Sequence, residues 1–216
     1  MGQPVFVIGN GESRRDYNWS NVQPHPRDQT SIANRPSFHG CNLSYQNSPA
    51  DYVFAADLQV AKMVRENFDP HKLFTRPEHL LDNSNTIYAY DWIEKHCDQY
   101  ERDLEPRNWG TGQLTLIHTA LIMQIEEIYM VGFDLWPHVE CKNNMFQDVE
   151  HNGVQLYKPN PPVDPRLWIR HSEIIFAYFP NTTFWQVQPD SWKPPQTWKQ
   201  YPNFKQIEFD NIKLFK

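Results

Sequence analysis

Short apolar runs alternate along the chain with longer segments whose apolar residues recur at helical spacing. The runs are rich in β-branched and aromatic side chains, which is typical of strands buried on both faces of a sheet. Strands are therefore expected at residues 4–8, 50–56, 72–74, 86–90, 127–134 and 183–187, with a shorter apolar piece at 38–41. The helical spacing predicts helices at residues 58–68, 91–104, 113–123 and 172–178. The helix at 113–123 is apolar on nearly every face, as a central, buried helix would be.

Strands that alternate with helices predict an α/β fold, in which a Rossmann-like and mostly parallel sheet is covered by helices. Residues 1–134 and 167–193 are expected to form this nucleotide-binding domain. Residues 135–166 are proline-rich, irregular and polar, and are expected to form a small lid-like insertion. Residues 194–216 carry several lysines and are interpreted as a C-terminal tail, a candidate arm for self-association into a homo-oligomer.

The eight glycines are few beside the 18 prolines, so the position of each glycine is informative. The first expected strand runs straight into Gly9-Asn10-Gly11-Glu12-Ser13. A glycine-rich turn after a strand is how α/β proteins bring backbone N–H groups up to a phosphate, because a Cβ there would block the approach. The alternative is an ordinary tight turn from strand to helix. Arg14 stands where the dinucleotide motif has its third glycine, and no Walker lysine follows, so a mononucleotide or sugar nucleotide is favoured over NAD or ATP.

Polar residues and glycines stand at or near the ends of the expected strands or the starts of the expected helices. The carboxyl ends of parallel strands meet at one edge of the sheet, where such folds bind their ligands. The sequence therefore predicts one crevice that gathers the candidate residues for binding a nucleotide and its sugar. They are Gly9, Asn10, Gly11, Ser13, Asn42, Asp57, Thr111, Gly112 and Asp134.

Several motifs follow one another along the chain: V-I-G-N-G-E-S at 7–13, G-C-N at 40–42, a strand ending at Asp57, T-G-Q at 111–113, E-I-Y-M-V-G-F-D at 127–134 and R-H-S at 170–172. In this order they resemble the bacterial sialyltransferases of glycosyltransferase family 42 and related phage-encoded Rossmann-like proteins. The resemblance covers residues 4–188. It implies a protein that takes a sugar from a CMP-sugar, which is CMP-sialic acid in the family, and transfers it to a hydroxyl of a glycan or another acceptor, without a metal or cofactor.

By the same resemblance, His171 would be the general base that takes the proton from the acceptor hydroxyl, since histidine titrates near neutral pH. The alternative for this position is that His171 and Ser172 merely begin a helix, with Ser172 as its N-cap. The departing phosphate would be stabilised by Arg14, Arg170 and Tyr157, of which Tyr157 stands for a tyrosine of the family's lid.

The donor end of the site departs from the family at two positions. Gly112 replaces a serine that follows the threonine matched by Thr111, and Asp57 stands near an asparagine. A carboxylate at Asp57 would repel a phosphate or the carboxylate of sialic acid, unless it pairs or binds a ribose hydroxyl. A different sugar or nucleotide therefore stays open. The residues that the resemblance still assigns to the nucleotide, its phosphates or the sugar are Asn10, Gly11, Ser13, Asn42, Thr111 and Gly112.

Composition narrows the classes of function. The 20 basic residues against 26 acidic ones give a formal charge of −6, which argues against general nucleic-acid binding. No apolar run is long enough for a membrane span and no basic-then-apolar signal region is found, so a cytoplasmic location is expected, in the host cytoplasm or the virion for a phage-encoded protein. Cys41, Cys97 and Cys141 are odd in number and widely spaced, which favours thiols over a disulfide framework or a zinc site.

The absence of an Asp-x-Asp pair favours a mechanism without the metal clamp of many glycosyltransferases. A competing metal site in or beside the insertion matches no ligand spacing known for proteins. Its members would be Asp134, His138, Glu140, Cys141, Asp148 and His151. Two functions stay open: a metal-independent glycosyltransferase, and a non-catalytic nucleotide-binding or virion module of the same fold. A pterin-type pyrophosphokinase would need ATP and a metal, and the missing acidic pair counts against it.

Overall fold

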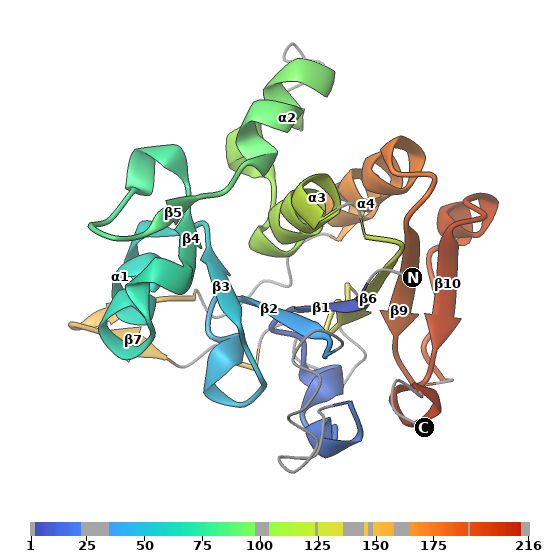
Figure 1. Cartoon of the computed structure of the whole chain (residues 1–216), viewed down its shortest axis with the longest axis horizontal. Helices are drawn as coiled ribbons and strands as arrows, with labels where there is room; N and C mark the ends of the chain where they lie inside the picture. Colours follow the sequence, from blue (N-terminus) through green and yellow to red (C-terminus); the bar gives the residue numbers. More distant parts are fainter. Residues whose placement is uncertain are drawn as a thin grey trace.

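The computed structural model describes residues 3–22, 35–97, 104–123, 125–135, 145–146, 149–157, 165–189 and 191–212. Its centre is an eight-stranded sheet in which all neighbouring strands are parallel (Figure 1). The strands are β1 (Val5–Ile8), β2 (Ser37–Cys41), β3 (Tyr52–Ala55), β4 (Leu73–Thr75), β5 (Asn85–Thr86), β6 (Glu127–Val131), β9 (Thr183–Val187) and β10 (Phe204–Ile207). The sheet is flanked by the helices α1 (Leu58–Asn67), α2 (Ala89–His96), α3 (Thr111–Met123) and α4 (Arg166–Tyr178). The expected α/β, Rossmann-like fold is confirmed.

The strand order is β10-β9-β6-β1-β2-β3-β4-β5, so β1 lies in the interior of the sheet. The chain first builds outward from β1 to β5 and then returns to the other side of β1 with β6. This reversal places a topological switch point between β1 and β6, where doubly wound folds bind their ligands. In the register, Ile8 at the end of β1 lies opposite Val131 at the end of β6. The loops that follow the two strands therefore leave the sheet side by side.

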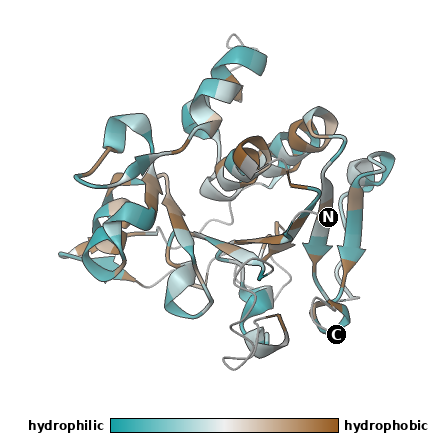
Figure 2. Ribbon diagram, viewed as in Figure 1, coloured by the Kyte–Doolittle hydropathy of each residue, from teal (hydrophilic) through white to brown (hydrophobic). Residues whose placement is uncertain are grey.

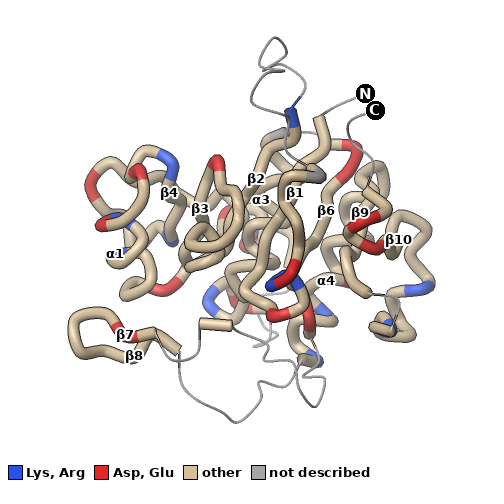
Figure 3. Tube along the Cα trace, turned by 90° about the horizontal axis from the view of Figure 1, so that it is seen from below, with Lys and Arg blue, Asp and Glu red and all other residues tan. Residues whose placement is uncertain are grey.

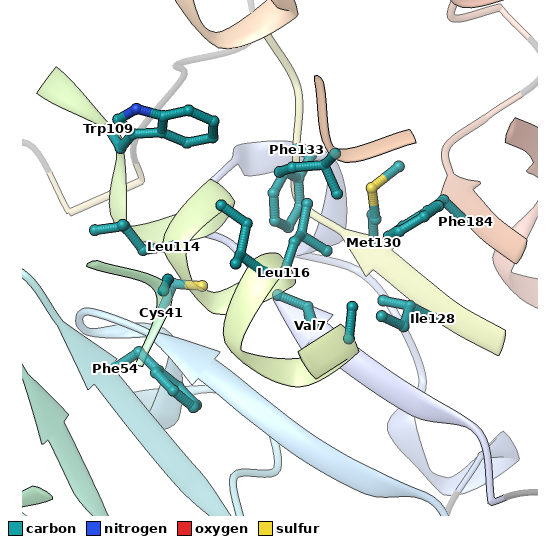
Figure 4. Close-up of a cluster of buried hydrophobic side chains, with 14 of the residues drawn as sticks. Val7, Cys41, Phe54, Trp109, Leu114, Leu116, Ile128, Met130, Phe133 and Phe184 are labelled. Atoms are coloured by element: carbon teal, nitrogen blue, oxygen red, sulfur yellow. The ribbon is translucent and has the colours of Figure 1, made fainter. Parts of the chain in front are cut away.

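Successive residues of β1 point to opposite faces of the sheet, as the two-residue period of a strand requires. Val5 and Val7 pack into the cluster beneath α3 and α4, whereas Phe6 and Ile8 belong to the cluster on the other face. α3 is the central helix that its all-round apolar sequence predicts, and Leu114 and Leu116 are fully buried. Figure 4 shows these leucines in one cluster with Val7. Figure 2 shows hydrophobic residues gathered on α3 and the central strands.

The opposite face of the sheet is covered in two different ways. Beside β3 and β4 the cover is α1, whose buried residues pack on those strands. Over β1, β2 and β6 the cover is formed by residues 17–22 and 209–212, where the ring of Tyr17 stacks on Phe209 with centroids 4.2 Å apart. Segments far apart in the sequence thus close this face together. The protein needs both to bury Phe6, which stacks between Phe38 and Tyr129.

The expected strand at 86–90 is wrong for most of its length. β5 ends at Thr86 and α2 begins at Ala89. The same apolar residues serve a helix, because Ala89, Tyr90 and Ile93 form its buried face beside α3. The helix expected at 91–104 ends at His96, where Cys97 turns extended with ψ 146°. Residues 98–103 lie outside the described chain.

Residues 194–212 do not form the expected tail. They build a short 3-10 helix (Gln196–Gln200) and β10, the edge strand beside β9. The buried Trp198 explains the difference, since its ring packs against Phe176 of α4 and Phe204 of β10. A self-associating arm therefore has no support from this segment.

The insertion and the start of α4 also differ from expectation. α4 begins at Arg166, earlier than the predicted 172. Within the expected lid the structure describes a hairpin of β7 (Glu150–His151) and β8 (Val154–Gln155), which lies beside α1 (Figures 1 and 3). No helix among the described residues is long and apolar enough to span a membrane. Figure 3 shows acidic and basic residues of the described chain interspersed along the trace.

Candidate functional site

The loop after β1 is held against the loop after β6 by backbone contacts. Gly9 N donates to Val131 O at 2.7 Å, and Gly11 N donates to Gly132 O at 2.9 Å. A Cβ at Gly9 would stand 2.6 Å from Gly132 O, and one at Gly11 would stand 2.5 Å from Asp134 Cγ. The glycines of this turn are therefore required by the approach of two protein loops. The N–H groups of Gly9 and Gly11, expected to face a phosphate, are used within the fold, as in the alternative of a tight turn.

Asp134 is the buried acceptor that fixes this loop. It is 2% exposed, and its carboxylate accepts hydrogen bonds from Ser13 N at 2.9 Å, from Ser13 Oγ and from Gln188 Nε2 at 2.9 Å. Trp192 Nε1 donates to Asp134 O at 3.2 Å. Ser13 and Asp134 were expected at a nucleotide, and the structure instead pairs them with each other. Gln188 and Trp192 belong to no local motif, so their part in this network could not be predicted from the sequence.

Arg14 is buried beneath the same loop, with 1% exposure. Its Nε donates to Gly9 O at 2.7 Å, and its Nη1 donates to Asn47 Oδ1 at 2.6 Å and to Ser48 Oγ. Burial lowers the pKa of this guanidinium to about 10. The neighbouring Arg15 is instead at the surface, paired with Glu12 at 2.7 Å. Arg14 thus braces the loop.

Asn42 and Thr111 come together at the carboxyl edge of the sheet, as the sequence predicts. Asn42 follows β2 with a left-handed φ of 54°, which asparagine tolerates better than most residues. Its Oδ1 accepts a hydrogen bond from Thr111 Oγ1 at 3.2 Å. Thr111 begins α3, so the free N–H groups and positive end of that helix lie at this edge. Gly112 has a packing reason, because a Cβ there would stand 2.8 Å from Phe133 Cε1.

Tyr157 of the insertion reaches the loop after β1. Asn10 Nδ2 donates to Tyr157 Oη at 3.3 Å, across 147 residues of sequence, and Met145 N donates to Asn10 O at 3.0 Å. Burial raises the pKa of the Tyr157 hydroxyl well above its usual value, and the Asp57 carboxylate adds a smaller contribution. Asp57 is exposed at the start of α1. Two predicted residues from segments far apart in the sequence, Asn10 and Tyr157, are therefore in contact.

His171 does not stand at the start of a helix, so the alternative in which His171 and Ser172 begin one is wrong, while its role as general base stays a prediction. It lies inside α4, and its ring is 0% exposed and stacks parallel on Trp109 with centroids 3.9 Å apart. Ser172 Oγ donates to Trp168 O at 2.9 Å within the helix and caps nothing. Arg170 is exposed on the same helix. Trp109 leads into α3, so His171 packs behind the start of that helix.

A polar cavity lies at the same edge of the sheet, beyond β9. It has a volume of about 530 Å³ and is lined by Lys193, Gln206, Ile207, Glu208 and Asn211. Gln206 Nε2 donates to Trp192 O at 3.2 Å, which joins the cavity to the network around Asp134. The nucleotide residues predicted from the sequence do not line it.

Neither a metal site among the described residues nor a known relative assigns a function to this chain. Among the described residues, no group of three or more His, Cys, Asp or Glu is placed to hold a metal ion. His138, Glu140, Cys141 and Asp148 lie outside the described residues, and His151 Nε2 contacts Glu66 Oε2 at 2.8 Å. Comparison with protein-family models, curated proteins and solved structures found no match.

Proposed function

We propose that the chain binds a nucleotide or nucleotide sugar, with CMP as the favoured nucleotide, at the carboxyl ends of β1 and β2, and transfers the sugar to a hydroxyl acceptor. The contact between Asn10 and Tyr157 carries this proposal. It joins the turn after the first strand to the insertion, at the switch point where such folds bind nucleotides. Asn42 and Thr111 supply further polar groups at the same edge.

The chemistry asked of these residues is to hold a departing phosphate. In the transfer, the acceptor oxygen bonds to the anomeric carbon while the bond from that carbon to the phosphate oxygen breaks, and the acceptor proton passes to a base. Hydrogen-bond donors aimed at the phosphate stabilise the charge that it gains. The Tyr157 hydroxyl is protonated at neutral pH and can donate, and burial, which raises its pKa, disfavours its ionisation further. The amide of Asn10 and the start of α3 are the other donors that we assign.

Two candidate functions differ in the step that removes the proton from the acceptor hydroxyl. In the first, His171 is the base, and Trp109 must move to bring its enclosed ring to the acceptor. In the second, the protein is a nucleotide-binding module without turnover. The burial of His171 under Trp109 favours the second candidate, whereas the contact of Asn10 with Tyr157 serves both.

Nucleotide binding is tested by melting the protein with CMP, UMP, GMP and AMP. We expect CMP to raise the melting temperature, since a ligand that binds only the folded state stabilises it. Asn10→Ser should lose most of this shift, while Asn67→Ser, an exposed asparagine of α1, should keep it. If none of the four nucleotides shifts the melting temperature, the proposal is wrong.

Turnover is tested by incubating the protein with CMP- and UDP-sugars and measuring released nucleotide. Release that disappears in His171→Gln but persists in His118→Gln, another buried histidine, would support the transferase. Binding of CMP without any release would support the module. Undiminished release by His171→Gln would remove this residue from the mechanism.

A further inference from the structure

Arg14 is a buried cation that has no ion pair in the described part of the chain. None of the ion pairs found there includes its guanidinium. Its Nη2 is buried and has no hydrogen-bond partner among the described residues. Asp134 acts on it electrostatically, but the oxygens of that carboxylate accept from Ser13 and Gln188. A buried charge normally has a counter-charge, because its desolvation is otherwise uncompensated.

The groups around Arg14 include a second donor that faces a weak acceptor. Asn47 accepts from Arg14 Nη1 through its Oδ1, while its Nδ2 donates to Met145 Sδ at 3.5 Å. A thioether sulfur is a weak acceptor. Ser48 accepts from the same Nη1, and its hydroxyl lies 3.4 Å from Asn47 Oδ1, a long hydrogen bond. Arg14 Nη2 is therefore a buried donor without a partner among the described residues, while the exposed Asn47 and the half-buried Ser48 hold donors whose protein acceptors are weak or distant.

Two consecutive residues of the insertion cover these donors. Met145 places its sulfur on Asn47, and Phe146 places its ring 5.9 Å from Arg14 Cζ. An aromatic face attracts a cation, but more weakly than an oxyanion that accepts charge-assisted hydrogen bonds. A sulfur and a ring thus occupy the positions where an oxyanion would bind more strongly.

We propose that Arg14, Asn47 and Ser48 form an anion subsite for a phosphate group, which binds Arg14 Nη2, Asn47 Nδ2 and the Ser48 hydroxyl in place of Met145 and Phe146. Binding there also releases Asn10 O from Met145 N, because the same insertion residue makes both contacts. The anion subsite thereby couples a phosphate to the loop that contacts Tyr157. The identity of this phosphate as that of a nucleotide rests on the proposed function, while the anion subsite does not.

The test measures binding of inorganic phosphate and pyrophosphate by calorimetry, against chloride at equal ionic strength. Phe146→Ala removes the ring over Arg14 and leaves every donor in place, so we expect pyrophosphate affinity to rise roughly fivefold or more. Arg14→Lys keeps the charge but loses the planar fork, and affinity should fall roughly tenfold. Arg15→Lys, at the exposed neighbour, is the matched control and should change nothing. If Arg14→Lys fails to fold, the Phe146→Ala arm still decides.

The outcomes separate the two proposals. Absence of pyrophosphate binding in both wild type and Phe146→Ala overturns the anion subsite, and so does equal affinity in the two. Binding of CMP that is unaffected by Arg14→Lys, with no binding of pyrophosphate, overturns the anion subsite and leaves the proposed function standing. Pyrophosphate binding that depends on Arg14, with no binding of any nucleotide, supports the anion subsite and removes the proposed function.

Discussion

The loop after β1 has two sides that are built differently. On the inner side, toward β6, its groups meet strong partners: Ser13 and Gln188 donate to the carboxylate of Asp134, and Gly11 N donates to Gly132 O at 2.9 Å. On the outer side, toward the insertion, contacts are longer or softer, with Asn10 Nδ2 at 3.3 Å from Tyr157 Oη and Arg14 Cζ 5.9 Å from the ring of Phe146.

This difference separates stability from binding. A buried polar network that is fully satisfied rigidifies the fold and leaves nothing for a ligand. Donors with weak partners, in contrast, gain more when a ligand replaces those partners. Much of the sequence signal that indicates a phosphate loop belongs to the inner side, whereas the donors with weaker partners lie on the outer side. Variants on the two sides should therefore separate unfolding from affinity.

The largest expected effect is on the inner side, at Asp134. Asp134→Ala leaves the half-buried Ser13 and the buried Gln188 as donors without their acceptor, so the free energy of unfolding should fall by about 3–5 kcal/mol. Urea unfolding measures it. Asp57→Ala, at an exposed carboxylate on the rim, is the control and should change stability little. An Asp134→Ala protein as stable as the wild type would contradict the role of Asp134 in stabilising the loop.

Next in size is the effect of adding one methyl group at Gly11. Its Cβ would stand 2.5 Å from both Asp134 Cγ and Gly132 O, so Gly11→Ala should lower the free energy of unfolding by about 2–3 kcal/mol. Gly153→Ala offers a control with open space and a φ of +76°, where strain alone should cost about 1 kcal/mol. Equal losses at the two glycines would show that the loops are not closely packed.

Acid should lower the free energy of unfolding through two buried histidines, neither of which lies on the outer side of the loop. Burial, with a smaller contribution from His118, lowers the pKa of His39 from 6.5 to about 3, and burial lowers that of His118 to about 4. Both stay neutral when folded but gain a proton when unfolded, so their stabilisation is complete above pH 6.5 and is lost as the pH falls toward 4. We expect the two histidines together to cost about 3 kcal/mol of stability between pH 6.5 and 5. Urea midpoints measure it, and His39→Gln should flatten the profile; an unchanged slope would contradict this origin.

The smallest expected change in stability comes from Asn42 on the outer side. Asn42→Gly suits the φ of 54° and removes only the side chain that Thr111 contacts, so the free energy of unfolding should stay within about 0.5 kcal/mol of the wild type. The affinity for CMP should nevertheless fall roughly tenfold. Asn42→Ala, which meets the same φ with a Cβ, checks the backbone contribution. A stability loss without an affinity loss would show that the Asn42 side chain stabilises the fold and does not bind the nucleotide.

The fold could be predicted where local pattern and tertiary role agree. The apolar run that became β1 and the all-round apolar α3 were confirmed, because a buried strand and a central helix each impose their own composition. The prediction failed at residues 87–90, where the same apolar spacing serves a strand or a helix. It also failed at β10, because a parallel edge strand is specified by distant partners such as Trp198 and Phe176.

The sequence could predict which loops carry the candidate residues, but not which way the side chains of those residues point. Strand ends and glycines are local features, so the sequence could predict which loops leave the sheet at one edge and that Asn42 and Thr111 lie together there. It could not show that Asp134 turns inward to Ser13, that Arg14 is buried against Asn47, or that His171 lies under Trp109. Each of these depends on a partner far away in the sequence, which no local motif records.

The central claim is that the outer side of the loop binds a nucleotide through Tyr157. Its most direct test is calorimetric titration of CMP into the wild type, Tyr157→Phe and Tyr88→Phe, an exposed tyrosine that serves as the control. The account predicts saturable binding to the wild type, affinity roughly tenfold weaker in Tyr157→Phe, and no change in Tyr88→Phe. Equal affinity in all three proteins, or no binding to the wild type, would contradict it.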